Sequence, residues 1–130
     1  MSATVLLEAV DLSKHFGGVR ALSKVNFKLG KGELLGVIGP NGSGKTTLVN
    51  AITCFVRPSS GKVLFKGRPI QHLPPHKIVR LGIARTFQMV RPFYQLPAFK
   101  NMIIPLFSPR LKDLPGGRYF AAGGPVTLPA

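Results

Sequence analysis

One octapeptide limits the possible folds of this chain more than any other feature. Residues 39–46 read Gly-Pro-Asn-Gly-Ser-Gly-Lys-Thr and fit the pattern Gly-x-x-x-x-Gly-Lys-Ser/Thr. Glycines at this spacing let a backbone turn its N–H groups inward around phosphate oxygens. The lysine then reaches the outer phosphates, and the hydroxyl after it can ligand Mg²⁺. The sequence therefore predicts a phosphate-binding loop.

The segments on either side of the octapeptide have the character that such a loop requires. Glu33 to Gly39 is a nearly continuous apolar run, typical of a strand that is covered on both faces of a parallel sheet. Lys45 to Val56 places Leu48, Ile52 and Phe55 at helical spacing. We therefore expect a central strand, the loop and a helix in succession, with the positive end of the helix dipole facing the phosphates.

Shorter elements are expected around this unit. The patterns predict strands over Thr4 to Val10, Val25 to Leu29 and Lys62 to Phe65. A further helix would begin at Pro74-Pro75 and end near Val79 or Arg80, before Gly82. Residues 107–130 contain four Gly and four Pro, which predicts a loop or tail there and a folded part over residues 1–106.

The charge balance indicates an anionic partner without identifying it. The chain has 18 Lys plus Arg against 4 Asp plus Glu, a formal charge of +14, and 45% apolar residues. That composition excludes an acidic disordered chain, and one cysteine excludes a disulfide scaffold. Nucleic acid, an anionic membrane face and a phosphorylated small molecule would all suit the charge. The cations are scattered, as on a solvated surface, and the apolar stretches are shorter than the roughly 20 residues that cross a bilayer.

Three stretches resemble the ATP-binding subunits of ABC transporters, most closely those of branched-chain amino acid importers. They are KHFGGVRAL from Lys14 to Leu22, the stretch from Gly32 to Val63 that contains the loop, and GIARTFQ from Gly82 to Gln88. The resemblance implies an α/β fold with the P-loop NTPase core of an ABC ATPase. The chain would be the N-terminal portion, with an antiparallel β subdomain, and would be incomplete at its C-terminus.

The resemblance also assigns roles to particular residues. Phe16 would stack on adenine, although a lone Phe also suits a core and His15 beside it could substitute. Gln88 would contact Mg²⁺ or the attacking water, although a lone Gln is also typical of a surface. Thr46 and Gln88 would be the metal ligands. The complete set that would bind the nucleotide is Phe16, Gly39, Pro40, Asn41, Gly42, Ser43, Gly44, Lys45, Thr46, Thr47 and Gln88.

The chain departs from the family where hydrolysis is concerned. It has no Leu-Ser-Gly-Gly-Gln signature, no apolar strand that ends in Asp-Glu, and no histidine after His76. Its acids are Glu8, Asp11, Glu33 and Asp113, none of which follows the loop on an apolar strand. We therefore predict no catalytic residue and expect an amino-terminal fragment, or a product that ends early, of such a subunit.

By resemblance, the cofactors are ATP and Mg²⁺, and the partners are transmembrane permease subunits and a second ATP-binding subunit in a head-to-tail dimer. The location is then peripheral, on the cytoplasmic face of the plasma membrane, and no nucleic acid partner is expected. Two alternatives stay open from the sequence: a basic phosphate-loop protein that binds nucleic acid, and an inert truncation product that does not fold.

Overall fold

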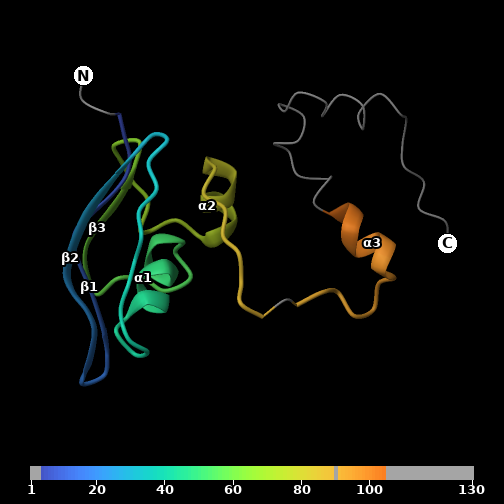
Figure 1. The fold of residues 1–130 in the computed structure, drawn as a ribbon, viewed down its shortest axis with the longest axis horizontal. Coiled ribbons are helices and arrows are strands. Elements are labelled where there is room, and N and C mark those ends of the chain that lie inside the picture. The colour runs from blue at the N-terminus through green and yellow to red at the C-terminus, as the bar shows by residue number, and fades with distance from the viewer. Residues whose placement is uncertain (1–3, 90, 105–130) are drawn as a thin grey trace. The chain divides into compact units, whose positions relative to one another are not determined.

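The computed structural model describes residues 4–89 and 91–104 (Figure 1). The chain divides into two compact units, Met1–Arg85 and Thr86–Ala130. The predicted tail over residues 107–130 lies outside the described residues.

The first unit is built on an antiparallel sheet, as the resemblance predicts. Its strands are β1 (Val5–Phe16), β2 (Val19–Gly30), β3 (Ser60–Phe65) and β4 (Arg68–Pro69), in the order β2-β1-β3-β4. β1 and β2 form one long hairpin, with Phe16 opposite Val19 beside the turn. Both strands are longer than predicted because bulges interrupt the alternation of apolar and polar residues on which the prediction depends.

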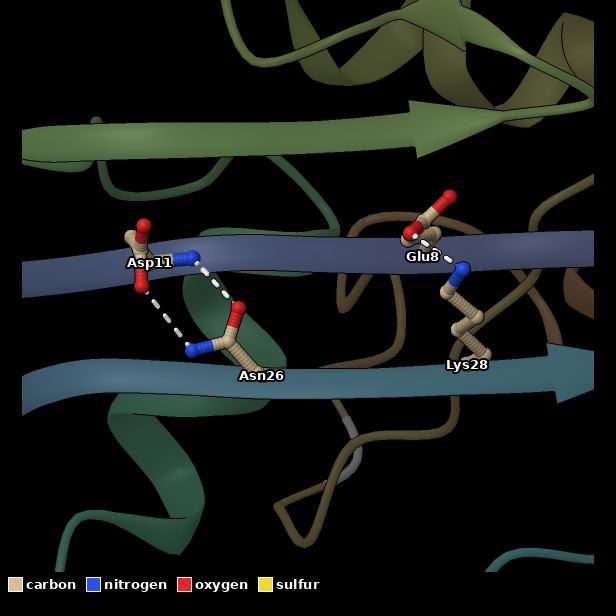
Figure 2. Close-up of polar contacts among 4 residues, drawn as sticks. All are labelled: Glu8, Asp11, Asn26 and Lys28. Carbon is tan, nitrogen blue, oxygen red and sulfur yellow. Dashed lines mark hydrogen bonds and ion pairs between the residues drawn. The ribbon is translucent and has the colours of Figure 1, made fainter.

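Polar contacts join β1 and β2 along the hairpin (Figure 2). The Glu8 carboxylate lies 3.2 Å from the Lys28 ammonium, which is its direct neighbour across the strands. Asn26 donates from Nδ2 to Asp11 Oδ1 at 3.0 Å and accepts from the Asp11 N–H at 2.8 Å. Asp11 has a left-handed backbone, with φ of 47°, so the Asn26 amide satisfies polar groups that the bulge removes from the ladder.

Two helices pack with the sheet around one core. α1 (Lys45–Ile52) begins where predicted, and α2 (Pro75–Leu81) follows Pro74 and ends at Gly82, whose φ of 113° is the left-handed C-cap expected there. The buried apolar residues from the strands, α1, α2 and the segments after α1 and β4 are Ala9, Leu12, Leu22, Leu48, Ala51, Cys54, Val63, Ile70 and Ile78.

The prediction that α1 continues to Val56 is wrong. The helix ends at Ile52 because Cys54 adopts a left-handed backbone with φ of 59°. The N–H of Phe55 then turns back to the carbonyl of Asn50 at 2.9 Å. Cys54 lies buried just beyond the helix, and its burial raises the pKa of the thiol, which favours the protonated form.

The predicted central strand over Glu33 to Gly39 is also wrong for the residues described. This segment has no strand pairing, and the side chains of Leu34 and Ile38 are 97% and 98% exposed. A strand needs a neighbour for its backbone N–H and C=O groups. β1 is paired on both sides, with β2 and β3, and no parallel neighbour is present among residues 4–89 and 91–104.

The described part of the second unit contains α3 (Ala98–Ile103), a helix that is not predicted from the sequence. The Asn101 side chain organises the turn before this helix. Its Oδ1 accepts from the Phe93 N–H at 2.8 Å, and its Nδ2 donates to the carbonyls of Phe93 and Leu96, each at 3.1 Å.

Arg85 fastens the end of the first unit onto α1, which leads to a stability prediction. Its Nη1 donates to Asn50 Oδ1 and, at 3.4 Å, to Thr53 Oγ1, and its guanidinium carbon lies 5.3 Å from the centre of the Phe55 ring. We expect Arg85→Ala to lower the free energy of unfolding by about 1–2 kcal/mol, because charge-assisted hydrogen bonds and a cation–π contact are lost. Urea unfolding followed by circular dichroism measures this change.

The matched control is Arg57→Ala, which removes an exposed arginine from the same unit. We expect that change to stay within about 0.5 kcal/mol of the unmodified chain. Similar losses in both variants would show that the contacts of Arg85 contribute nothing of their own.

Candidate functional site: the glycine-rich loop

The loop of residues 39–44 leads directly into α1. Gly42 and Gly44 have φ of 82° and 97°, values that side-chain-bearing residues rarely adopt. The Ser43 N–H donates to the Pro40 carbonyl at 3.2 Å, which closes a tight turn. The Gly44 carbonyl then accepts the Leu48 N–H at 2.8 Å, the first hydrogen bond of the helix. The helix N-terminus therefore starts within the loop, where its N–H groups favour an anion.

The Lys45 ammonium lies inside the loop that precedes it. It donates to the carbonyls of Gly39 and Pro40, the latter at 2.7 Å, and to the Ser43 hydroxyl at 3.2 Å. All three acceptors are neutral. A phosphate oxygen carries charge and forms a stronger hydrogen bond with an ammonium group, so a phosphate would compete well for Lys45.

Close packing explains why two positions of the loop are glycine. A Cβ at Gly39 would lie 2.6 Å from the Ser43 hydroxyl oxygen. A Cβ at Gly44 would clash with the backbone carbonyl oxygen of Ala21 and lie 3.3 Å from Leu22 Cδ2. The loop is thus seated directly against the start of β2.

This contact between loop and strand forms a pocket of about 280 Å³. The residues that line it include two cationic ones, Arg20 and Lys45, and no acid. The volume is near the low end of the range of about 300–1,000 Å³ that is typical of ligand sites. The lining residues come from the start of β2, the loop and the start of α1: Val19, Arg20, Ala21, Asn41, Gly42, Gly44, Lys45, Thr46 and Thr47.

Most of the predicted loop residues gather at this pocket. Asn41, Gly42, Gly44, Lys45, Thr46 and Thr47 line it. The other three, Gly39, Pro40 and Ser43, hold the Lys45 ammonium.

Of the two predicted residues outside the loop, Phe16 belongs to the same compact unit as the pocket but does not line it. Phe16 lies opposite the lining residue Val19 in the hairpin, is 49% exposed, and has the Lys14 ammonium 4.9 Å from its ring centre. Its role with adenine stays a prediction. Gln88 belongs to the second compact unit, so its predicted contact with Mg²⁺ stays a prediction too.

The pocket wall made by Val19, Arg20 and Ala21 is not predicted from the sequence. These residues have no phosphate-binding pattern of their own. The available signal was indirect, since they follow the Gly17-Gly18 turn within a stretch that resembles the family.

Comparison with known proteins identifies the family. The sequence model of the family described as ABC transporter matches residues 22–122. This chain belongs to the ABC transporter family. The probable branched-chain amino acid transport ATP-binding protein LivG of Archaeoglobus fulgidus is 48% identical over 99 residues, which are 76% of this chain and 38% of LivG. The high-affinity branched-chain amino acid transport ATP-binding protein BraF of Pseudomonas aeruginosa is 43% identical over 99 residues, 76% of this chain and 39% of BraF.

Solved structures of the ABC transporter family share the fold. A dimeric bacterial ABC transporter cassette superposes with a TM-score of 0.68 and 28% sequence identity, over 78% of this chain and 47% of the cassette. The predicted fold class is therefore confirmed over the part that aligns. This member of the family spans less than half the length of the relatives that it matches.

None of the helices among residues 4–89 and 91–104 has the length and apolar character needed to cross a bilayer.

Proposed function

We propose that this chain forms the ATP-binding part of the energy-coupling subunit of an ABC importer for branched-chain amino acids. ATP binding and hydrolysis by the assembled transporter would power the transport. LivG and BraF are both named as branched-chain amino acid transport ATP-binding proteins, which supports the substrate class. The observation that carries the proposal is the loop geometry, in which the Lys45 ammonium, two left-handed glycines and the N-terminus of α1 meet at one pocket.

The residues at the pocket suit a nucleotide with its metal ion. The phosphates would lie against the loop, where Lys45 and the N-terminus of α1 offer positive charge. Thr46, which is exposed on the first turn of α1, would hold Mg²⁺ through its hydroxyl, and Gln88 would supply a second ligand. When bound, Mg²⁺ neutralises charge on the phosphate oxygens.

Hydrolysis would need groups that the described residues do not provide. Glu8 is paired with Lys28, and Asp11 accepts from Asn26. The Glu33 carboxylate accepts from the Gly30 N–H at 2.6 Å. None of these three lines the pocket, and Asp113 lies outside the described residues. We therefore propose that the chain binds ATP and depends on other parts of the transporter for the general base.

The proposed partners follow from the family. Cassettes of ABC transporters act with transmembrane permease subunits, and the dimeric cassette above supports a second ATP-binding subunit as the other partner. We propose a peripheral place on the cytoplasmic face of the plasma membrane. The relatives' names favour this function over the nucleic-acid-binding alternative.

Thermal unfolding of the purified chain tests the proposal. At about one hundred times its dissociation constant, ATP with Mg²⁺ should stabilise the folded chain by about 2.7 kcal/mol, because it binds the folded form alone. Lys45→Ala should remove that shift, since the ammonium at the phosphates is lost. Lys31→Ala, a change at an exposed lysine outside the pocket, should retain it. A chain that ATP does not stabilise, or an equal shift with Lys45→Ala, would contradict the proposal.

A further inference from the structure

The pocket has a second cation that the loop motif does not explain. Arg20 lies near the start of β2 and lines the same pocket as the loop residues. It is exposed, and its guanidinium makes no hydrogen bond or ion pair with any residue that the structure describes. Its direct neighbour across the hairpin is His15, not an acid. Arg20 is thus available to a ligand, and no carboxylate competes for it.

Lys45 differs from Arg20 in this respect. Its ammonium is already engaged by two carbonyls and one hydroxyl of the loop. A triphosphate carries several negative charges, more than one ammonium group can balance. A guanidinium is planar and can donate two parallel hydrogen bonds to a phosphate group, which a lysine cannot do. The absence of acids from the pocket lining leaves this charge uncompensated until an anion binds.

We infer that Arg20 is a second phosphate-binding cation of this site and that it makes the pocket favour nucleotides of higher charge. The inference rests on the proposed ATP site. It predicts that the contribution of Arg20 grows with the number of phosphates, because the attraction between ligand and guanidinium scales with ligand charge.

Calorimetric titration of the full 130-residue chain with ATP, ADP and adenosine, each with Mg²⁺, tests this inference. We expect Arg20→Gln to weaken ATP binding by about two- to fivefold, the loss typical of a contact made by an exposed charge. The loss should be smaller for ADP and absent for adenosine. Arg20→Lys keeps the charge without the planar fork, so it should recover part of the loss. Arg68→Gln removes the same charge from an exposed position on β4, outside the pocket, and should bind all three ligands like the unmodified chain.

Three results would overturn the inference. In the first, Arg20→Gln would bind ATP as tightly as the unmodified chain and the Arg68→Gln control. In the second, Arg20→Gln would lose affinity for ATP and for adenosine by the same factor, which would show that the substitution changes the shape of the pocket and not its attraction for charge. Failure of the unmodified chain to bind ATP would refute the proposed function first and this inference with it, and that failure is seen before any variant is made. Circular dichroism melts of each variant show whether it folds, and Arg20→Lys provides the charge test in a side chain of similar length.

Discussion

Replacing Gly61 with alanine should lower the midpoint of thermal unfolding by roughly 10–20 °C, the shift expected for about 3 kcal/mol in a domain of this size. Gly61 has φ of +87°, which costs a side-chain-bearing residue about 1–2 kcal/mol. The new Cβ would also lie 2.7 Å from the Leu12 Cα and still closer to the Asp11 carbonyl. Leu12 is completely buried, so the backbone cannot yield without disturbing the core, and overpacking of this kind costs about 1–3 kcal/mol.

Gly67→Ala is the matched control for this change. Gly67 has a similar φ of +76°, but a Cβ there would meet no heavy atom within 4 Å. We therefore expect only the conformational cost, about 1 kcal/mol, and a correspondingly smaller shift. Thermal melts followed by circular dichroism compare the two. Equal shifts would mean that the close approach of β3 to the bulge of β1 is not what makes glycine necessary at residue 61.

The same bulge limits how much of the strands can be predicted from the sequence. The alternation of Val25, Phe27 and Leu29 is a local signal, and it correctly predicts part of β2. Asp11 and Lys24 interrupt the pattern, because both adopt positive φ in the hairpin. Their conformation depends on the partner strand, so a local pattern cannot reveal that β1 and β2 continue through them.

The helices follow the same division between local and tertiary causes. Residues with local backbone preferences, Pro74 and Gly82 among them, mark the start of α1 and both ends of α2. The boundaries predicted there agree with those of the structure to within two residues. The end of α1 is set by the left-handed turn at Cys54, whose thiol lies 3.2 Å from the Ile70 carbonyl. That contact joins residues far apart in sequence and has no local signal.

The segment over Glu33 to Gly39 shows the opposite case, in which a strong local pattern is not sufficient. Its apolar run has the composition of a buried strand, yet the structure leaves Leu34 and Ile38 exposed. A central strand is defined by neighbours on both sides, and composition alone cannot supply them. The apolar pattern shows that the segment is suited to a buried strand, but the segment forms a strand only where neighbouring strands pair with it.

The candidate site divides in a similar way. The loop from Gly39 to Thr46 could be predicted from its motif alone, because phosphate binding by backbone N–H groups fixes which residue types are needed. The opposite wall, which includes Arg20, comes from β2. Its place depends on the packing of Gly44 against the Ala21 carbonyl, a tertiary contact that the sequence does not reveal.

That contact leads to the second prediction with a large effect. Gly44→Ala should lower the free energy of unfolding without nucleotide by about 2–3 kcal/mol, as the sum of left-handed strain and a clash with backbone. The Cβ cannot be accommodated by a side-chain rotation, because the atom that it meets most closely is the Ala21 carbonyl oxygen. The loop would have to move away from β2, which displaces the N-terminus of α1. We therefore also expect stabilisation by ATP and Mg²⁺ to be lost.

Two further glycines separate these effects. Gly42→Ala has comparable strain, with φ of +82° and no heavy atom within 4 Å of the new Cβ, so without nucleotide it should cost only about 1 kcal/mol. Gly32→Ala, with φ of +77°, introduces strain outside the pocket and should keep the full stabilisation by ATP. Urea unfolding measures the first comparison and thermal shift the second. If Gly44→Ala were no less stable than Gly42→Ala, or kept the ATP shift of Gly32→Ala, then the seating of the loop on β2 would not be what positions the phosphate-binding backbone.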